Sequence, residues 1–201
     1  MAIEKEAKVF NPGFSKNYVF EAFGEDISSA QCSQIVDTYL ESCCGQGFSA
    51  DDRLMRVRDA GGNLYLTVKG PDVSDGIYKK REEYEVEITP MVRDTLFLMN
   101  RAVLKIEKNR YVLDYDGIEL VYDTVFRFSR AEDERKHFFK MNIWSATQMT
   151  NIFEAEGDDE DKIAYVLGVL GIFEGDLTTV SNYEYFMGLS DGGKPLASKS
   201  L

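Results

Sequence analysis

Alternating polar and apolar residues predict that most of this chain forms β-strands. Successive side chains of a strand point to opposite faces, so a period of two is its signature, and that period recurs in many short segments here. Two of the intervening turns, Ala60-Gly61-Gly62 and Asp116-Gly117, are hairpin signals. The predicted strands are residues 2–10, 18–23, 53–59, 63–69, 78–88, 103–115, 119–128 and 137–144.

Helical periodicity is confined to a few segments between and after the strands. Residues 28–43 place apolar side chains on one stripe, as an amphipathic helix does. Thr89 and Pro90 combine an N-cap with proline at the first helical position, which predicts a helix ending near Arg101. Ser145 is a candidate cap of another helix, and residues 158–171 carry acids in the first turn followed by apolar positions.

The order of these elements predicts an α+β fold whose sheet is a closed barrel. The strands are mostly adjacent along the chain and linked by hairpins, so they are expected to pair antiparallel. Eight antiparallel strands with no parallel crossover favour a closed barrel with flanking helices. Residues 1–190 are predicted to form one domain, and residues 191–201 a disordered tail.

The composition disfavours nucleic acid and membranes as partners. Hydrophobic residues make up 44% of the chain, enough for a core, and the net charge of −12 repels anionic surfaces on average. No apolar run approaches the roughly 20 residues that a membrane span needs. Residues 1–10 include four charged side chains, so a signal peptide is not expected. Cys32, Cys43 and Cys44 do not form a disulfide framework, which favours a cytoplasmic location. The composition does not decide whether the chain forms a homo-oligomer.

Charged residues share faces on several predicted strands. Positions 79, 81, 83, 85 and 87 are Lys, Arg, Glu, Glu and Glu, and all five project to one side. Arg56 and Arg58 are paired in the same way, as are Lys108 and Arg110. A solvated surface would explain any one of these strands, but recurrence over several favours a lumen lined with both charges. Such a lumen suits a divalent metal, held by acids, and phosphate, held by bases.

The same segments resemble the motifs of the CYTH, or triphosphate tunnel metalloenzyme, family. Glu4-Lys5-Glu6-Ala7-Lys8 resembles the family's opening Glu-x-Glu-x-Lys. Residues 53–58 and 66–70 are similar to its central block, and Arg81-Glu82-Glu83-Tyr84-Glu85 to its Arg-x-Glu-x-Glu strand. Lys108-Asn109-Arg110-Tyr111 and the following strand with Asp123 continue the likeness. The resemblance covers nearly the whole chain and is most specific over residues 53–87.

The resemblance implies a metal-dependent hydrolase acting on a triphosphate inside the barrel. The family includes inorganic triphosphatases, thiamine triphosphatases and class IV adenylate cyclases, so the bound molecule is expected to be a polyphosphate or nucleotide with Mg²⁺ or Mn²⁺. The implied catalytic and metal-binding residues are Glu4, Glu6, Glu83 and Glu85, with Asp123 as a further metal ligand. The implied substrate-binding residues are Lys8, Arg56, Arg58, Lys69, Arg81, Lys108 and Arg110.

Two departures from the family pattern keep an alternative open. The predicted closing strand, residues 137–144, has Lys140 and Asn142 where the family carries two metal-binding glutamates. That change favours a catalytically degenerate protein that binds a nucleotide or polyphosphate without turnover. The long spacing after Lys8 also leaves residues 18–23 open as the first strand. The acidic run 154–161 is interpreted as a solvated loop and helix N-terminus. An adenylate cyclase is disfavoured, because no adenine pocket is identified.

Overall fold

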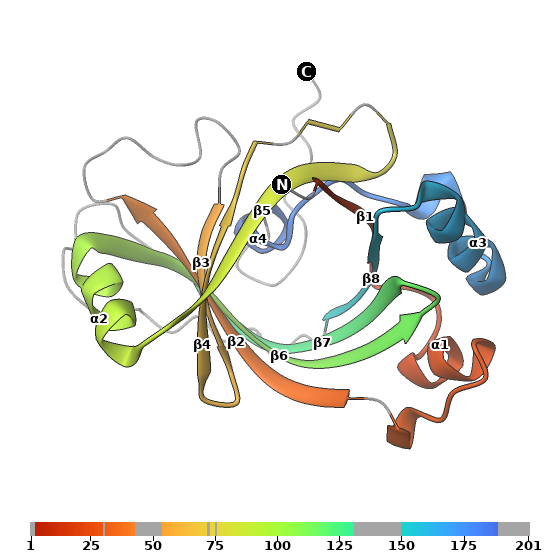
Figure 1. The fold of residues 1–201 in the computed structure, drawn as a ribbon, viewed down its shortest axis with the longest axis horizontal. Helices are drawn as coiled ribbons and strands as arrows, with labels where there is room; N and C mark the ends of the chain where they lie inside the picture. Colours follow the sequence, from red (N-terminus) through yellow and green to blue (C-terminus); the bar gives the residue numbers. More distant parts are fainter. Residues whose placement is uncertain are drawn as a thin grey trace.

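A computed structural model describes residues 3–29, 31–42, 54–71, 73–74, 76–130 and 150–188. Within them, eight strands form a closed antiparallel barrel in the order β1-β5-β4-β3-β2-β6-β7-β8 (Figure 1). The predicted barrel is therefore confirmed. The strands are β1 Ile3–Phe10, β2 Gln31–Ser42, β3 Leu54–Ala60, β4 Asn63–Lys69, β5 Lys79–Ile88, β6 Asn100–Tyr115, β7 Ile118–Arg130 and β8 Thr150–Gly157.

Tight turns join two of the strand pairs where the sequence predicts hairpins. Gly61 and Gly62, between β3 and β4, have φ angles of 62° and 98°, and Asp116 and Gly117, between β6 and β7, have 52° and 79°. Two consecutive positive φ angles give the mirror-image turn whose twist matches that of paired strands. Glycine adopts these angles without strain, which explains why both turns depend on it.

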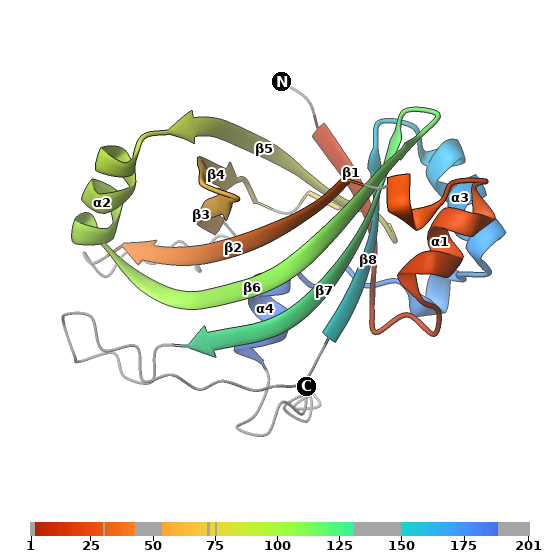
Figure 2. The ribbon, with the colours of Figure 1, turned by 90° about the horizontal axis from the view of Figure 1, so that it is seen from below.

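Four helices flank the barrel in the described residues: α1 Lys16–Ala22, α2 Pro90–Met99, α3 Glu160–Leu170 and α4 Asn182–Met187, with 3-10 turns at Ile27–Ser29 and Glu174–Asp176. α2 begins as predicted, with the Thr89 side chain accepting a hydrogen bond from the Val92 amide. Helices α1 and α3 lie together on one side of the barrel and α2 on the opposite side (Figure 1, Figure 2). Over the described residues, no helix is long and apolar enough to cross a bilayer.

The apolar core lies mainly between the outer barrel wall and these helices. Ala7 and Val9 of β1 pack in one cluster with Phe153 of β8 and with Ile163 and Leu167 of α3. Because side chains alternate along a strand, the neighbouring positions of β1 must face the lumen. The polar lumen is thus a direct consequence of packing the opposite face against helices.

The short helix α4 covers one mouth of the barrel. Phe186 is fully buried and lies 5.1 Å from the Phe128 ring, and Tyr185 stacks on Phe10 at 3.9 Å. The Tyr183 hydroxyl donates to Glu41 at 2.8 Å. Strands β1, β2 and β7 run in the same direction in this antiparallel order, and these contacts lie near their C-terminal ends. The C-terminal segment therefore closes over that end of the lumen.

One predicted strand and one predicted helix were wrong. Residues 18–23 mostly fall in α1, where Val19 and Phe20 are both buried and Ser15 caps the first turn. Residues 28–43 are largely the strand β2 rather than a helix. Both faces of β2 carry buried residues, because Leu40 packs in the cluster with α2 while Asp37 is buried on the inner side, so the alternation of a strand is obscured.

The closing strand is also different from the one predicted. β8, Thr150–Gly157, pairs with both β7 and β1 and completes the barrel, so residues 137–144 do not close it. Those residues, Ser145 and the tail 191–201 lie outside the described residues. The first strand is β1, as the motif predicts, and not residues 18–23.

Candidate functional site

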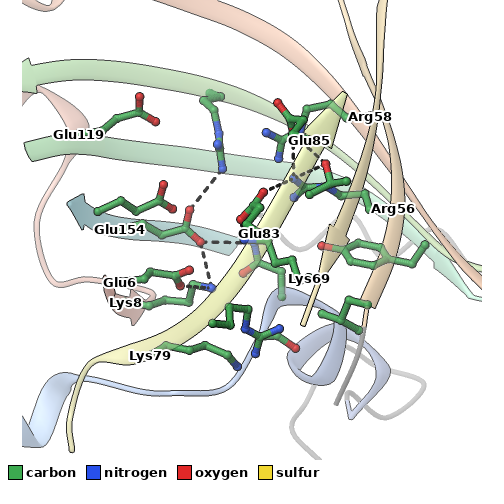
Figure 3. Close-up of a pocket in the computed structure, with 18 residues that line it drawn as sticks. Glu6, Lys8, Arg56, Arg58, Lys69, Lys79, Glu83, Glu85, Glu119 and Glu154 are labelled. Carbon is green, nitrogen blue, oxygen red and sulfur yellow. Dashed lines mark hydrogen bonds and ion pairs between the residues drawn. The ribbon is translucent and has the colours of Figure 1, made fainter. Parts of the chain in front are cut away.

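A polar cavity occupies the barrel interior. Figure 3 shows Glu6 and Glu154 on one side of it and Arg56 and Arg58 on the other, with Glu85 beside these arginines. The lining residues come from β1, β2, β3, β4, β5, β6, β7, β8 and the start of α4. They are Glu6, Lys8, Tyr39, Leu54, Arg56, Arg58, Thr67, Lys69, Lys79, Arg81, Glu83, Glu85, Arg110, Glu119, Glu154, Glu156, Ser181 and Asn182.

Three carboxylates, which we call the carboxylate cluster, meet where β1 and β8 pair. Glu6, Glu154 and Glu156 each offer an oxygen, and these oxygens lie within 4.8 Å of one another. The register places Glu6 opposite Glu156 and Lys8 opposite Glu154. The Lys8 ammonium lies 2.5 Å from Glu6 and 3.1 Å from Glu154. A group of closely spaced carboxylates with one cation beside it fits the oxygen ligands that divalent metals such as Mg²⁺ prefer.

The electrostatics of the carboxylate cluster differ between its members. Burial alone would lower the pKa of Lys8, but Glu154 and Glu6 outweigh it and raise that pKa. Burial alone would raise the pKa of Glu154, but Lys8 and Arg110 outweigh it and lower that pKa. For Glu156, burial and the neighbouring charges of Glu154 and Glu6 act together and raise the pKa to about 7. Glu156 is therefore the carboxylate whose charge is least compensated.

Six basic residues, the cationic cluster, project into the same cavity from four strands. They are Arg56 and Arg58 of β3, Lys69 of β4, Lys79 and Arg81 of β5, and Arg110 of β6. Arg56 donates to the Thr67 hydroxyl at 3.1 Å and lies 3.8 Å from Glu83 and 3.7 Å from Glu85. Lys69 lies 2.5 Å from Glu83. Arginine and lysine grouped in this way suit the several anionic oxygens of a polyphosphate.

Two fully buried aspartates lie behind the arginines. Arg58 donates through Nε and Nη2 to the two oxygens of Asp37, at 2.8 and 3.1 Å. Arg110 donates through the same two atoms to Asp123, at 2.9 and 2.8 Å. Lys108 lies between them, 2.5 Å from Asp123 and 3.4 Å from Asp37. Burial would raise the pKa of Asp37, but Arg58 and Arg56 outweigh it and hold that pKa well below its usual range.

These contacts join into one chain of ion pairs in which acids and bases alternate. Each link is an N–O contact within 4.0 Å, and the chain includes a residue from each of the eight strands. In order, its members are Glu6, Lys8, Glu154, Arg110, Asp123, Lys108, Asp37, Arg56, Glu83 and Lys69.

The C-terminal segment adds polar groups from outside the barrel wall. Ser181 and Asn182 line the cavity, and the Asn182 amide donates to Glu154 at 3.4 Å. Lys79 of β5 donates to the Thr179 carbonyl and lies 3.6 Å from Glu184. The segment leading into α4 is thus attached directly to both clusters.

Comparison with known proteins settles the family. A family model described as the CYTH domain matches residues 2–157. The chain belongs to the CYTH family. Its β1 carries the opening Glu-x-Glu-x-Lys motif, and its β8 carries the Glu-x-Glu pair that the motif comparison had sought in residues 137–144.

Solved structures share the CYTH barrel at low sequence identity. The chain is similar to PH1819 from Pyrococcus horikoshii OT3, with 22% identity and a TM-score of 0.62 over 92% of this chain and 98% of that chain. It is also similar to a putative adenylyl cyclase from Hippeastrum, described as revealing a dominant triphosphatase activity, with 14% identity and a TM-score of 0.56 over 100% of both chains. A putative adenylate cyclase from Bacillus halodurans matches with 14% identity and a TM-score of 0.54, over 92% of this chain and 99% of that chain. At these identities the likeness shows the fold alone. No curated protein matches the chain.

Most of the residues predicted from the CYTH motifs line the cavity. They are Glu6, Lys8, Arg56, Arg58, Lys69, Arg81, Glu83, Glu85 and Arg110. Glu4 pairs with Arg81 in the strand ladder, and its side chain is not among the described ones. Lys108 and Asp123 lie elsewhere: both are fully buried, pair with each other and do not belong to the described cavity lining.

Several lining residues were not predicted from the sequence, and the structure corrects one interpretation of it. Glu154 is 3% exposed, so the run 154–161 is not simply a solvated loop, and the reason for seeking glutamates near Lys140 and Asn142 disappears. The signal was present in the sequence, since Glu154-Ala155-Glu156 is itself a Glu-x-Glu. The other missed lining residues are Tyr39, Leu54, Thr67, Lys79, Glu119, Ser181 and Asn182, and Asp37 lies behind the lining.

Proposed function

We propose that this CYTH protein binds a linear triphosphate inside its barrel and hydrolyses it with Mg²⁺ or Mn²⁺. The observation that carries the proposal is the juxtaposition, within one cavity, of the carboxylate cluster and the cationic cluster. Neither cluster alone would suffice, since metals and phosphate chains need opposite charges. Together they match the two halves of a metal–triphosphate complex.

The residues present fit a divalent metal. Glu6, Glu154 and Glu156 supply oxygen donors at close spacing, and the pKa of about 7 at Glu156 reflects negative charge that a cation would offset. Bound there, a divalent cation would polarise a phosphoryl oxygen and neutralise charge that develops in the transition state. Glu83 and Glu85, two further predicted ligands, already pair with Lys69 and Arg56, so we assign them to holding the cationic cluster.

The chain's own residues would bind and orient the phosphates. Arg56 and Arg110 are fixed by neighbouring acids and offer several N–H donors in a planar group, which suits bidentate contacts to phosphate. Lys69 and Arg81 extend the positive surface along β4 and β5. Donors held in place before the substrate arrives stabilise the transition state without reorganisation.

The lining favours inorganic triphosphate over larger substrates. Thirteen of the eighteen described lining residues are charged, and among the described ones Tyr39 and Leu54 are the two with largely apolar side chains. Tyr39 is 5% exposed, and its ring centroid lies 5.6 Å from that of Tyr183, so it offers little surface on which a nucleobase or thiamine ring could stack. Nucleoside and thiamine triphosphates remain alternatives within the same proposal. A cytoplasmic location completes it, because the net charge and the three cysteines suit neither membrane surfaces nor a disulfide framework.

The alternative of a degenerate binder loses its main support. It rested on Lys140 and Asn142 closing the barrel, whereas β8 closes it with Glu154 and Glu156. Cyclisation of a nucleotide has no specific support among the described lining residues. Both alternatives are therefore treated as outcomes of the test.

The test is phosphate release from inorganic triphosphate, ATP and thiamine triphosphate with Mg²⁺, Mn²⁺ or EDTA. Metal-dependent release from inorganic triphosphate is expected, and Glu154→Gln or Glu156→Gln should reduce it at least a hundredfold. Glu107→Gln is the matched control, because Glu107 pairs with Lys105 and Arg127 away from the described cavity lining. Tight triphosphate binding with no turnover under any metal would establish the binder instead, and unchanged turnover in both variants would refute the site.

A further inference from the structure

Asp37 and Asp123 have an unusual place in the interior. Both are 0% exposed, and neither belongs to the described cavity lining, yet each contacts an arginine that does. In both pairs the carboxylate accepts from Nε and Nη2, the same edge of the guanidinium. Two independent pairs, one between β2 and β3 and one between β6 and β7, thus share one geometry.

The geometry leaves the other side of each guanidinium for the lumen. Arginine carries five N–H donors, and an Nε–Nη2 contact with a carboxylate uses only two of them. The two Nη1 donors of each guanidinium stay available on a planar group that can no longer rotate freely. In Arg110, Nη2 also donates to Glu154 at 3.3 Å. Arg58 and Arg110 line the cavity, so the available donors belong to the surface that a phosphate would meet.

Lys108 connects the two pairs into one layer. Its ammonium is within 3.4 Å of Asp37 and 2.5 Å of Asp123, and its side chain is 1% exposed. The layer therefore contains three cations and two anions. If the lumen only had to attract a polyanion, the two aspartates would weaken it by cancelling positive charge. The two aspartates are therefore better explained as groups that orient the arginines than as groups that set the charge of the lumen.

We propose that Asp37 and Asp123 are positioning residues that aim Arg58 and Arg110 at the phosphate chain, with Lys108 holding the two carboxylates in place. This inference rests on the proposed function, because it assumes that the lumen binds a triphosphate. The family motifs imply that Asp123 binds the metal and that Lys108 binds the substrate. Here both residues belong instead to a layer behind the cavity lining, which contacts neither metal nor substrate.

The test is the affinity for inorganic triphosphate, measured by calorimetry in EDTA at low temperature for wild type, Asp37→Asn and Asp123→Asn. Asparagine keeps the shape of aspartate but presents one acceptor and one donor, so it cannot accept from both Nε and Nη2. We expect Kd to rise at least tenfold in each variant, although each variant removes one negative charge from behind the lumen. Unchanged or tighter binding would refute the inference. Glu107→Gln, with the same change in net charge, should bind as wild type.

A double-mutant cycle shows whether Asp37 acts through Arg58. Adding Asp37→Asn to Arg58→Ala should change Kd much less than Asp37→Asn alone does, because the residue that Asp37 holds by two hydrogen bonds is already gone and only its longer contacts with Arg56 and Lys108 remain. A further tenfold loss would mean that Asp37 acts on the site in another way. If wild type itself does not bind triphosphate, the proposed function fails. If wild type binds triphosphate and the aspartate variants bind it equally well, only the positioning role of the aspartates fails.

Arg58→Lys covers the case in which the asparagine variants do not fold. Lysine keeps the charge and a partner for Asp37 but has no second edge to present. We therefore expect Arg58→Lys to lose as much triphosphate affinity as Arg58→Ala. Binding by Arg58→Lys equal to that of wild type would overturn the inference, because charge alone would then be sufficient.

Discussion

Replacing Glu156 by glutamine should stabilise the metal-free protein, by an amount that grows as the pH rises above about 4.5. In the folded protein the pKa of Glu156 is raised from 4.5 to about 7, first by burial and then by repulsion from Glu154 and Glu6. At about 1.36 kcal/mol per pH unit, this difference corresponds to about 3 kcal/mol of destabilisation once the group is ionised in both states. Glutamine carries no charge and avoids that cost.

The sign of the pH dependence follows from the order in which the two states lose the proton. Below about pH 4.5 both the folded and the unfolded chain keep it, and Glu156 contributes nothing. Between about 4.5 and 7 the folded state binds the proton more tightly, so stability falls as pH rises. Above about 7 both states are ionised, and the full cost remains. The advantage of Glu156→Gln should therefore grow from near zero at pH 4.5 to about 3 kcal/mol at pH 8.

Urea unfolding in EDTA between pH 4.5 and 8 measures this difference directly. Wild type and Glu156→Gln are compared at each pH, with Glu107→Gln as a control that should show no such trend. Saturating Mg²⁺ or Mn²⁺ should restore wild-type stability at pH 8 and leave Glu156→Gln unchanged, since the variant lacks one ligand. An advantage that is constant across pH, or absent, would show that charge repulsion at Glu156 is not the cause.

Three further predictions concern single features of the barrel. Lys8→Met leaves Glu6 and Glu154 without their shared buried cation and should lower the free energy of unfolding by about 3–5 kcal/mol at pH 7; a loss below 1 kcal/mol in chemical denaturation would contradict the reading. In Gly157→Ala, the new Cβ would lie 2.5 Å from the Cδ1 atom of buried Ile118, which should cost about 1–3 kcal/mol in thermal unfolding; Gly168→Ala, whose Cβ meets nothing within 4 Å, should not destabilise. Inorganic triphosphate should raise Tm more than monophosphate at equal concentration, and high salt should shrink the difference; equal shifts would argue against a polyphosphate site.

Local patterns in the sequence predicted the elements that depend on local geometry. The turns at Gly61-Gly62 and Asp116-Gly117 were readable because positive φ angles favour glycine. The lumen-facing residues of β5 were readable because Lys79, Arg81, Glu83 and Glu85 occupy every second position of one strand. Where both faces of an element are buried, as in β2, that signal fails, and a helix was predicted instead.

The rest of the candidate site depends on contacts between distant segments. Asp37 looks like an ordinary surface acid until β3 and β6 bring Arg58 and Lys108 beside it. Glu154 was read as part of a solvated acidic run because nothing local distinguishes it from the acids that follow. Asn182 reaches the cavity only because α4 folds back over the barrel mouth. No short window of residues encodes which strands pair in which register, or that the C-terminal segment packs back over the barrel.

The alternating chain of ion pairs that runs through all eight strands also constrains how this protein can change over evolutionary time. Each of its inner members has an opposite charge on both sides, so losing one removes a partner from two other charged groups at once. Charge changes at these positions should therefore be tolerated mainly in pairs, one acid and one neighbouring base together. Among relatives of this chain, we expect Asp37, Lys108 and Asp123 to vary jointly, while the outer-wall charges at Lys105 and Glu107 vary independently of them.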